Sequence, residues 1–120
     1  MAVSDTVQRR LRERGTAEHI VRQGAEGLIA RWRTFVAQVE GGYPLGLDDF
    51  RNDLDIRSLI AFTGLDHEVG PEDERFRKLL IPARQSLWES DTPDAFWVCG
   101  YPKNASGALL KDLRHEGLAD

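Results

Sequence analysis

Apolar side chains recur at steps of three and four residues over residues 16–40, which is the spacing of one face of an α-helix. The stripe consists of Val21, Ala25, Leu28, Ile29, Trp32, Phe35, Val36 and Val39. We expect Thr16 to cap the start of this helix, because its hydroxyl can accept a hydrogen bond from an exposed first-turn amide. Gly24 and Gly27 each cost a helix about 1 kcal/mol relative to alanine, which predicts that another element packs closely over them.

Two further helices are predicted in the middle of the chain. The turn sequence at residues 43–46 precedes a helix that begins at residue 47 or 48 and ends before Gly64, a suitable left-handed terminator. Its buried side is expected to consist of Phe50, Leu54, Ile56, Leu59 and Ile60. Pro71 suits the first position of the next helix, and Pro82 is expected to kink or divide that helix near Lys78. The apolar stripe of this second helix is expected to consist of Phe76, Leu79, Leu80, Ala83 and Leu87.

The last third of the chain has a less regular pattern. Residues 92–94 look like a helix start with Pro93 at the first helical position, whereas the run FWVCGY at residues 96–101 also has the composition of a strand. We predict a short helix there. Asn104 is expected to cap a final helix that stops at Gly117, and the apolar positions of this helix are Leu109, Leu110 and Leu113.

Together these elements predict an all-α protein, an irregular bundle of five or six helices in a single domain over residues 1–120. Residues 1–15 are expected to form a loosely attached N-terminal helix, because helical spacing at residues 5–14 is followed directly by Gly15. No alternating pair of strands and no internal repeat is expected from the pattern.

The composition fits one globular domain. The chain has 120 residues, of which 41% are hydrophobic. No apolar run approaches the roughly 18 residues that span a bilayer, and the first residues lack the apolar segment of a signal peptide, so no membrane partner is expected. The single cysteine, Cys99, has no second thiol to pair with, which predicts a reducing, cytoplasmic location. Its apolar neighbours predict a buried structural thiol rather than a nucleophile.

The formal net charge of −4 is unevenly distributed. Residues 48–74 contain nine acids against only Arg51 and Arg57, and such a segment repels nucleic acid and favours a basic partner. The run RRLRER at residues 9–14 lacks the interleaved aromatics of a nucleic-acid site, so we interpret it as an exposed helical face. We therefore expect no nucleic-acid partner and a protein partner with a basic surface.

The acidic stretch has three interpretations. Asp48, Asn52 and Asp55 recur at i, i+4 and i+7 on one helical face, while Asp49 and Asp53 form a second i, i+4 pair. Because the helix dipole favours acids in a first turn, capping with a solvated face is the preferred interpretation, ahead of a partner-binding face. A Mg²⁺ site would need oxygen ligands from a second helix, and the sequence has no comparable second motif. No metal, cofactor or catalytic residue is therefore predicted.

Aromatic residues crowd into one part of the chain, at Trp88, Phe96, Trp97 and Tyr101. Closure of the core is the preferred interpretation, and anchoring of an interface is the alternative. Arg57 is expected to pair with Asp53, four residues before it, and to lie partly buried beneath Tyr43 or Trp32. The candidate binding residues are Tyr43, Asp49, Asn52, Asp53, Arg57, Trp97 and Tyr101.

Four motifs, W-x2-F-V-x2-V-x-G-G-Y, D-D-F-x-N-D-L-D-x-R, E-R-F-R and W-V-x-G-Y-P, run through about the last three quarters of the chain. The residues that carry them include Trp32, Gly42, Tyr43, Asp49, Phe50, Asn52, Asp53, Leu54, Asp55, Arg57, Arg75, Phe76, Arg77, Trp97 and Pro102. The combination resembles a group of small, uncharacterised bacterial proteins. This resemblance implies a bacterial cytosolic domain, and it implies no activity, cofactor or site.

Two functional hypotheses follow from these patterns. The preferred one is a non-catalytic protein-binding module, of the inhibitor or immunity type, that presents an acidic, aromatic-flanked face to a basic protein, since no catalytic constellation is present. The alternative is a small divalent-metal-dependent hydrolase acting on a phosphorylated small molecule, with Asp49, Asp53 and a histidine such as His67 as ligands.

Overall fold

Five α-helices make up most of the part of the chain that the computed structural model describes, which is residues 2–90, 92 and 94–120. The helices are α1 (Ala2–Glu13), α2 (Glu18–Glu40), α3 (Leu47–Phe62), α4 (Gly70–Leu79) and α5 (Gly107–His115). Short elements complete the fold, namely the 3₁₀ turns η1 (Asp66–Val69) and η2 (Phe96–Val98) and the strands β1 (Leu80–Pro82) and β2 (Gly100–Pro102). The predicted all-α helical bundle is confirmed. Among the described residues, no helix is sufficiently long and apolar to traverse a bilayer.

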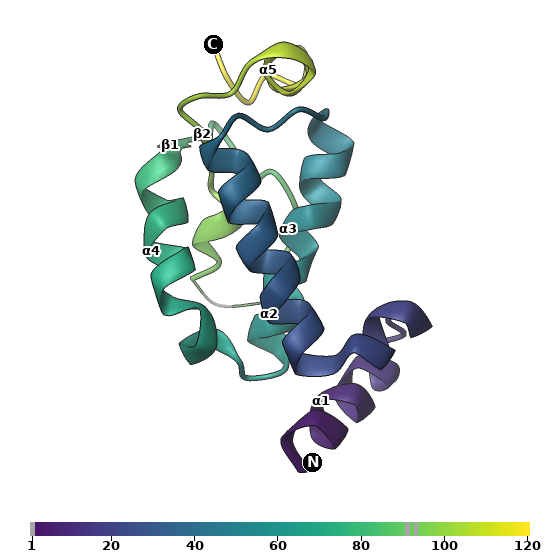
Figure 1. Cartoon of the computed structure of the whole chain (residues 1–120). Helices are drawn as coiled ribbons and strands as arrows, with labels where there is room; N and C mark the ends of the chain where they lie inside the picture. Colours follow the sequence, from purple (N-terminus) through teal and green to yellow (C-terminus); the bar gives the residue numbers. More distant parts are fainter. Residues whose placement is uncertain (1, 91, 93) are drawn as a thin grey trace.

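Helix α2 is the central element of the bundle. It lies between α3 and α4, with α1 at one end of the molecule and α5 at the other (Figure 1). Its buried stripe packs Trp32 and Phe35 against Phe76 of α4, and Phe35 also meets Phe50 of α3, with ring centroids 5.1–5.7 Å apart. Such aromatic pairs contribute about 0.5–1.5 kcal/mol each beyond the burial of their area. The helical spacing of the sequence thus positions the core as expected.

Helix α2 is interrupted at Gly24. This residue has φ 61° and ψ −153°, a conformation that side chains with a Cβ rarely adopt. The break folds Gln23 back over Gly27, where an added Cβ would lie 2.2 Å from the Gln23 Cβ. The prediction that another element packs over these glycines is wrong at Gly27, where the close neighbour is Gln23 of the same helix. At Gly24 the structure gives a different reason for glycine, namely the positive φ at the break. The predicted cap at Thr16 is wrong, because Ala17 occupies the cap position without a side-chain hydrogen bond.

Helix α3 begins at Leu47 and is followed by Gly64 in the left-handed region at φ 75°, as predicted. Its second half is buried nearly all round, because Ile56, Leu59 and Ile60 all pack into the core. Near this end, the guanidinium groups of Arg10 and Arg14 lie over the Phe62 ring at 4.7 and 5.0 Å. The first half of α3 is covered on one side alone.

The region after α4 corrects three predictions, the first of which is that no pair of strands forms. The helix ends at Leu79, and the chain continues as β1, which pairs antiparallel with β2 so that Ile81 faces Tyr101. Pro82 therefore lies in a strand and does not kink a helix. The expected short helix at residues 96–101 is the single turn η2 followed by β2. Glycine is needed at position 100, because a Cβ there would lie 2.7 Å from the Ile81 carbonyl oxygen.

The loop after Leu87 contains Pro93, the predicted first residue of a helix, which lies outside the described residues. Ala83 and Leu87 were expected to continue the α4 stripe. They lie instead in an irregular segment that is held to the 3₁₀ turn η2 and its end by hydrogen bonds from the Ala83 amide to the Cys99 carbonyl and from the Leu87 amide to the Val98 carbonyl.

The final helix, α5, covers one end of the bundle. Ser106 occupies its cap position, so the predicted cap at Asn104 is wrong. The Asn104 side-chain amide donates to the carbonyl oxygens of Val39 and Glu40 in the last turn of α2, where carbonyl groups lack the usual intrahelical partner four residues on. Asp112 of α5 in turn accepts a hydrogen bond of 3.0 Å from the Leu47 amide. Side chains of the last helix region thus satisfy backbone groups at the end of α2 and the start of α3.

Candidate functional site

The first half of α3 carries an acidic patch, defined here as Asp48, Asp49, Asn52, Asp53 and Asp55. The three side chains in the middle of the patch, Asp48, Asn52 and Asp49, are exposed, and Asp53 and Asp55 at its edges are half-buried. The patch exists because the first half of α3 packs on the core through Leu47, Phe50 and Leu54 on the opposite side.

Little positive charge neutralises the acidic patch. The Asp48 carboxylate is 98% exposed and 3.8 Å from Arg51, a pair that contributes little in water. Arg51 makes its shorter contacts elsewhere, at 2.7 Å to Glu116 and 2.7 Å to the Leu87 carbonyl. Burial raises the pKa of Asp55, and Arg14 only partly opposes this effect. The patch is therefore a locally negative, hydrated surface.

Tyr43 lies behind the edge of the patch and is 5% exposed. Its hydroxyl donates a hydrogen bond of 2.6 Å to Asp53 Oδ2, and its ring packs edge-on against Phe35 and Phe50 at 5.7 and 5.2 Å. Burial and the Asp53 carboxylate raise the pKa of Tyr43 strongly above its usual value. Tyr43 thus orients Asp53 and is itself part of the core.

We expect Tyr43→Phe to lower the free energy of unfolding by about 1 kcal/mol, because it removes one hydrogen bond to a carboxylate and keeps the ring packing. A raised pKa means that the folded state keeps the Tyr43 proton while the unfolded state releases it above about pH 10. The stability of the wild-type protein should therefore fall above that pH, and more steeply than that of Tyr43→Phe. Urea unfolding between pH 7 and pH 11 measures both effects. The prediction is contradicted if the wild-type protein and Tyr43→Phe have the same free energy of unfolding at pH 7 and the same decrease of it toward pH 11.

Arg57 is the centre of a buried polar network and is 3% exposed. Its Nε and Nη2 groups donate to the two oxygens of Asp73 at 2.9 and 2.8 Å, and Nη2 also lies 2.8 Å from Asp66. Trp32 Nε1 donates to the same Asp73 at 3.0 Å. The predicted burial of Arg57 is correct, but the predicted pairing with Asp53 is wrong, because Asp53 binds Tyr43.

Trp97 closes this network from the other side. The Arg57 guanidinium lies 4.5 Å from the centre of the Trp97 ring, and Trp97 Nε1 donates to Ser58 Oγ at 3.1 Å. Trp97 is 2% exposed, and Tyr101 in β2 is half-buried. Arg57 and Trp97 are thus inaccessible to a partner. Of the seven predicted binding residues, Asp49 and Asn52 are exposed in the patch, and Asp53 is half-buried there.

The ligand set of the metal-dependent alternative is dispersed. Asp49 lies in the first turn of α3 and His67 follows its last turn, about 20 Å farther along a helix rising 1.5 Å per residue. His67 lies 3.2 Å from Glu68, and Asp53 is bonded to Tyr43. Within the described part of the chain, no three His, Cys, Asp or Glu side chains gather in a group that could hold a metal ion.

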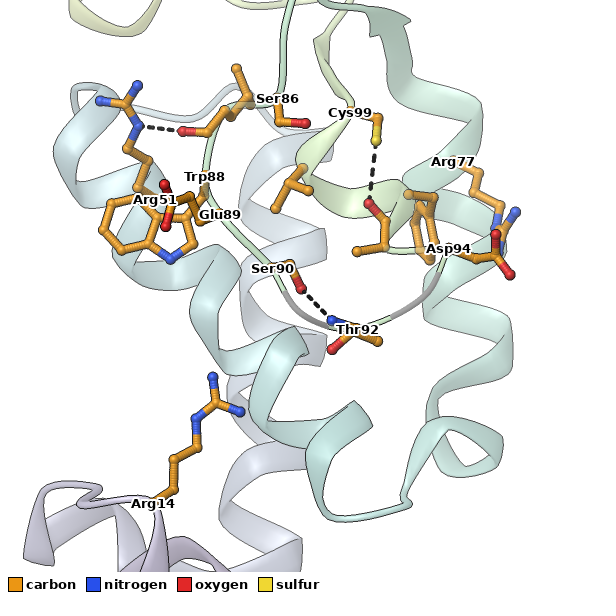
Figure 2. A pocket seen from close by; sticks show the side chains of 14 residues that line it. Arg14, Arg51, Arg77, Ser86, Trp88, Glu89, Ser90, Thr92, Asp94 and Cys99 are labelled. Atoms are coloured by element: carbon orange, nitrogen blue, oxygen red, sulfur yellow. Dashed lines mark hydrogen bonds between the residues drawn. The ribbon is translucent and has the colours of Figure 1, made fainter.

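A concave region lies beside the segment that follows β1 (Figure 2). This hollow of about 1470 Å³ is open to solvent. Three arginines from different parts of the chain, Arg14, Arg51 and Arg77, line it together with Trp88 and Phe96. Cys99 also lines it and is exposed, so the predicted burial of this thiol is wrong.

Comparison of the chain with protein-family models, with curated proteins and with solved structures finds no match. The site must therefore be interpreted from its own geometry. The acidic patch on α3 and the hollow beside η2 both carry chemistry that a ligand could use.

The sequence pattern pointed to the acidic patch and missed the hollow. Pro82 and the run SLWESDTPD at residues 86–94, rich in serine, aspartate and proline, were the available loop signal. This loop signal was missed because the apolar Leu87 falls in register with the α4 stripe. Arg77 and Trp88 belong to the hollow only because the chain reverses after Leu79.

Proposed function

We propose that this protein is a cytoplasmic, bacterial, non-catalytic protein-binding module, of the inhibitor or immunity type, whose acidic patch binds a basic protein surface. One observation carries the proposal: Asp48, Asp49 and Asn52 are exposed on consecutive turns of α3. Arg51, the basic side chain beside Asp48, makes its shorter contacts with Glu116 and the Leu87 carbonyl oxygen. Exposed charge of one sign steers a partner of the opposite sign and sets the register of the complex.

The rigidity of the patch supports the same proposal. Its backbone is a helix whose other face is held by Phe50 and Leu54, and its edge residue Asp53 is fixed by Tyr43. A charged surface on a rigid helix loses little conformational entropy on binding, which favours specific recognition. Two acids farther along the chain, Glu72 and Asp73, are buried against arginines and do not extend the patch.

The proposal is tested by placing a photo-crosslinking amino acid at position 52 and, as a control, at Glu26, an exposed acid of α2 outside the patch. A protein captured from position 52 alone is then purified and its affinity measured. Asp48→Asn with Asp49→Asn should weaken binding about five- to tenfold, because two exposed charge pairs contribute up to about 1 kcal/mol each. The association rate of this double variant should also depend less on salt concentration than that of the wild-type protein.

Glu26→Gln is the matched neutral control and should leave the affinity unchanged. Equal affinities of the wild-type protein and the Asp48→Asn, Asp49→Asn variant would contradict the proposal. So would crosslinks that form equally well from positions 26 and 52.

A further inference from the structure

The wall of the hollow formed by α4 presents the guanidinium group of Arg77, which is stacked on an aromatic ring and forms no ion pair with another described residue. The Arg77 guanidinium lies over the Phe96 ring at 4.0 Å from its centre. Among the described residues, no ion pair involves Arg77. A planar guanidinium that covers an aromatic face still has its edge N–H groups free, in the fork geometry that matches a carboxylate. Arg77 therefore offers a preorganised donor pair at the edge of the hollow.

Part of the lining of the hollow is apolar. Leu87, Ala95 and Val98 are buried at its base, and Phe96 adds the aromatic face that carries Arg77. The hydroxyl groups of Ser86, Ser90 and Thr92 stand on the surrounding segment (Figure 2). An apolar surface with polar groups around it suits a small molecule that has both an apolar ring and a polar group.

We propose that this hollow binds a small aromatic carboxylate, with its ring against the apolar base beside Phe96 and its carboxylate on the edge of Arg77. A bidentate pair between a carboxylate and a guanidinium fixes both partners in one plane and is among the stronger charge-assisted contacts. A ring of one or two fused units fills only part of the hollow, which at about 1470 Å³ exceeds the usual ligand site. This site is separate from the acidic patch and does not depend on it.

Two acidic side chains in the hollow repel a bound anion, and removing one of them should therefore strengthen binding. Glu89 and Asp94 line the hollow, and Asp94 lies on the same side as Arg77 in Figure 2 without forming an ion pair to it among the described residues. The carboxylate of the ligand and that of Asp94 would therefore compete for the guanidinium of Arg77. Asp94 has φ 58°, a conformation that asparagine also tolerates, so Asp94→Asn removes this charge without a backbone change.

The test is an NMR titration of the isotope-labelled protein with 1-naphthoate, using neutral 1-naphthamide as the matched probe. Naphthoate should shift the amide signals of Ala95, Phe96 and Val98 and the Nε–H signal of Arg77 in a saturable way, and leave those of α5 unchanged. Arg77→Gln should weaken binding at least fivefold, whereas Asp94→Asn should tighten it at least twofold. Lys78→Gln, a charge change on the same helix outside the hollow, should have no effect.

Three results would overturn the proposal. The first is the absence of a saturable shift in the wild-type protein. The second is equal affinity for naphthamide and naphthoate, which would show that the carboxylate is not recognised. The third is wild-type affinity in Arg77→Gln while its spectrum shows the folded protein.

Discussion

Asp73→Ala is expected to lower the free energy of unfolding by about 3–5 kcal/mol, the largest loss predicted for a single side chain of this protein. The cause is the charge that remains. Arg57 is 3% exposed and donates two hydrogen bonds to the Asp73 carboxylate, which the substitution removes. Trp32 Nε1 also donates to Asp73 and loses its acceptor. Burial alone would lower the pKa of Arg57, whereas Asp73 and Asp66 raise it, so removing Asp73 removes the main compensation for a buried cation.

Denaturant unfolding of a set of variants tests this account. Asp73→Asn keeps an acceptor for Trp32 and should lose less than Asp73→Ala. Asp66→Ala should cost under about 1 kcal/mol, because the Asp66 carboxylate is 56% exposed. The double variant Arg57→Met, Asp73→Leu should lose much less than the sum of its single changes, since an apolar pair leaves no stranded charge. Additive losses would show that the two side chains do not interact.

Gly24→Ala should destabilise the protein by about 1–3 kcal/mol, the reverse of the gain that alanine brings inside an ordinary helix. The reason is the backbone at Gly24, with φ 61° and ψ −153°, which a Cβ strains. Straightening α2 to relieve this strain would pull its first turns from α1, which they pack against.

Gly41→Ala provides the control for the Gly24 prediction. Gly41 ends the same helix with φ −84°, and a Cβ there would be at an ordinary distance of 3.6 Å from the nearest backbone oxygen. Its effect on the free energy of unfolding should stay within about 0.5 kcal/mol. Thermal or urea unfolding of the two variants compares them directly. A stabilised Gly24→Ala variant would mean that α2 is continuous in solution.

Helices could be predicted wherever the apolar spacing and the terminators were local. The stripe of α2, the start of α3 at Leu47 and the first-turn position of Pro71 in α4 all agree with the structure. Each depends on neighbours within about four residues, since an amphipathic helix and its ends are set by side chains one turn apart. The exposure of Asp49 and Asn52 followed from the same periodicity.

Predictions failed where the partner was distant in sequence. Leu80 has the register of the α4 stripe, yet it pairs with Pro102 of β2, and Cys99 is exposed beside a hollow that exists only through this pairing. Asn104 looked like a helix cap and binds the end of α2 instead. At Leu80 and Asn104, a hydrogen bond made in the tertiary structure outweighed a local preference.

The candidate binding residues divide in the same way. The sequence by itself determined a helical bundle, an acidic face at the start of α3 and a buried Arg57, because periodicity reports which side of a helix faces the core. It did not determine that Arg57 pairs with Asp73 rather than Asp53, since the sequence spacing identifies only Asp53, four residues away on the same helix, and cannot identify an acid on another helix. The tertiary structure decided this choice: packing of α4 against α2 places Asp73 beside Trp32 and Arg57, in a region where an unpaired charge would be costly.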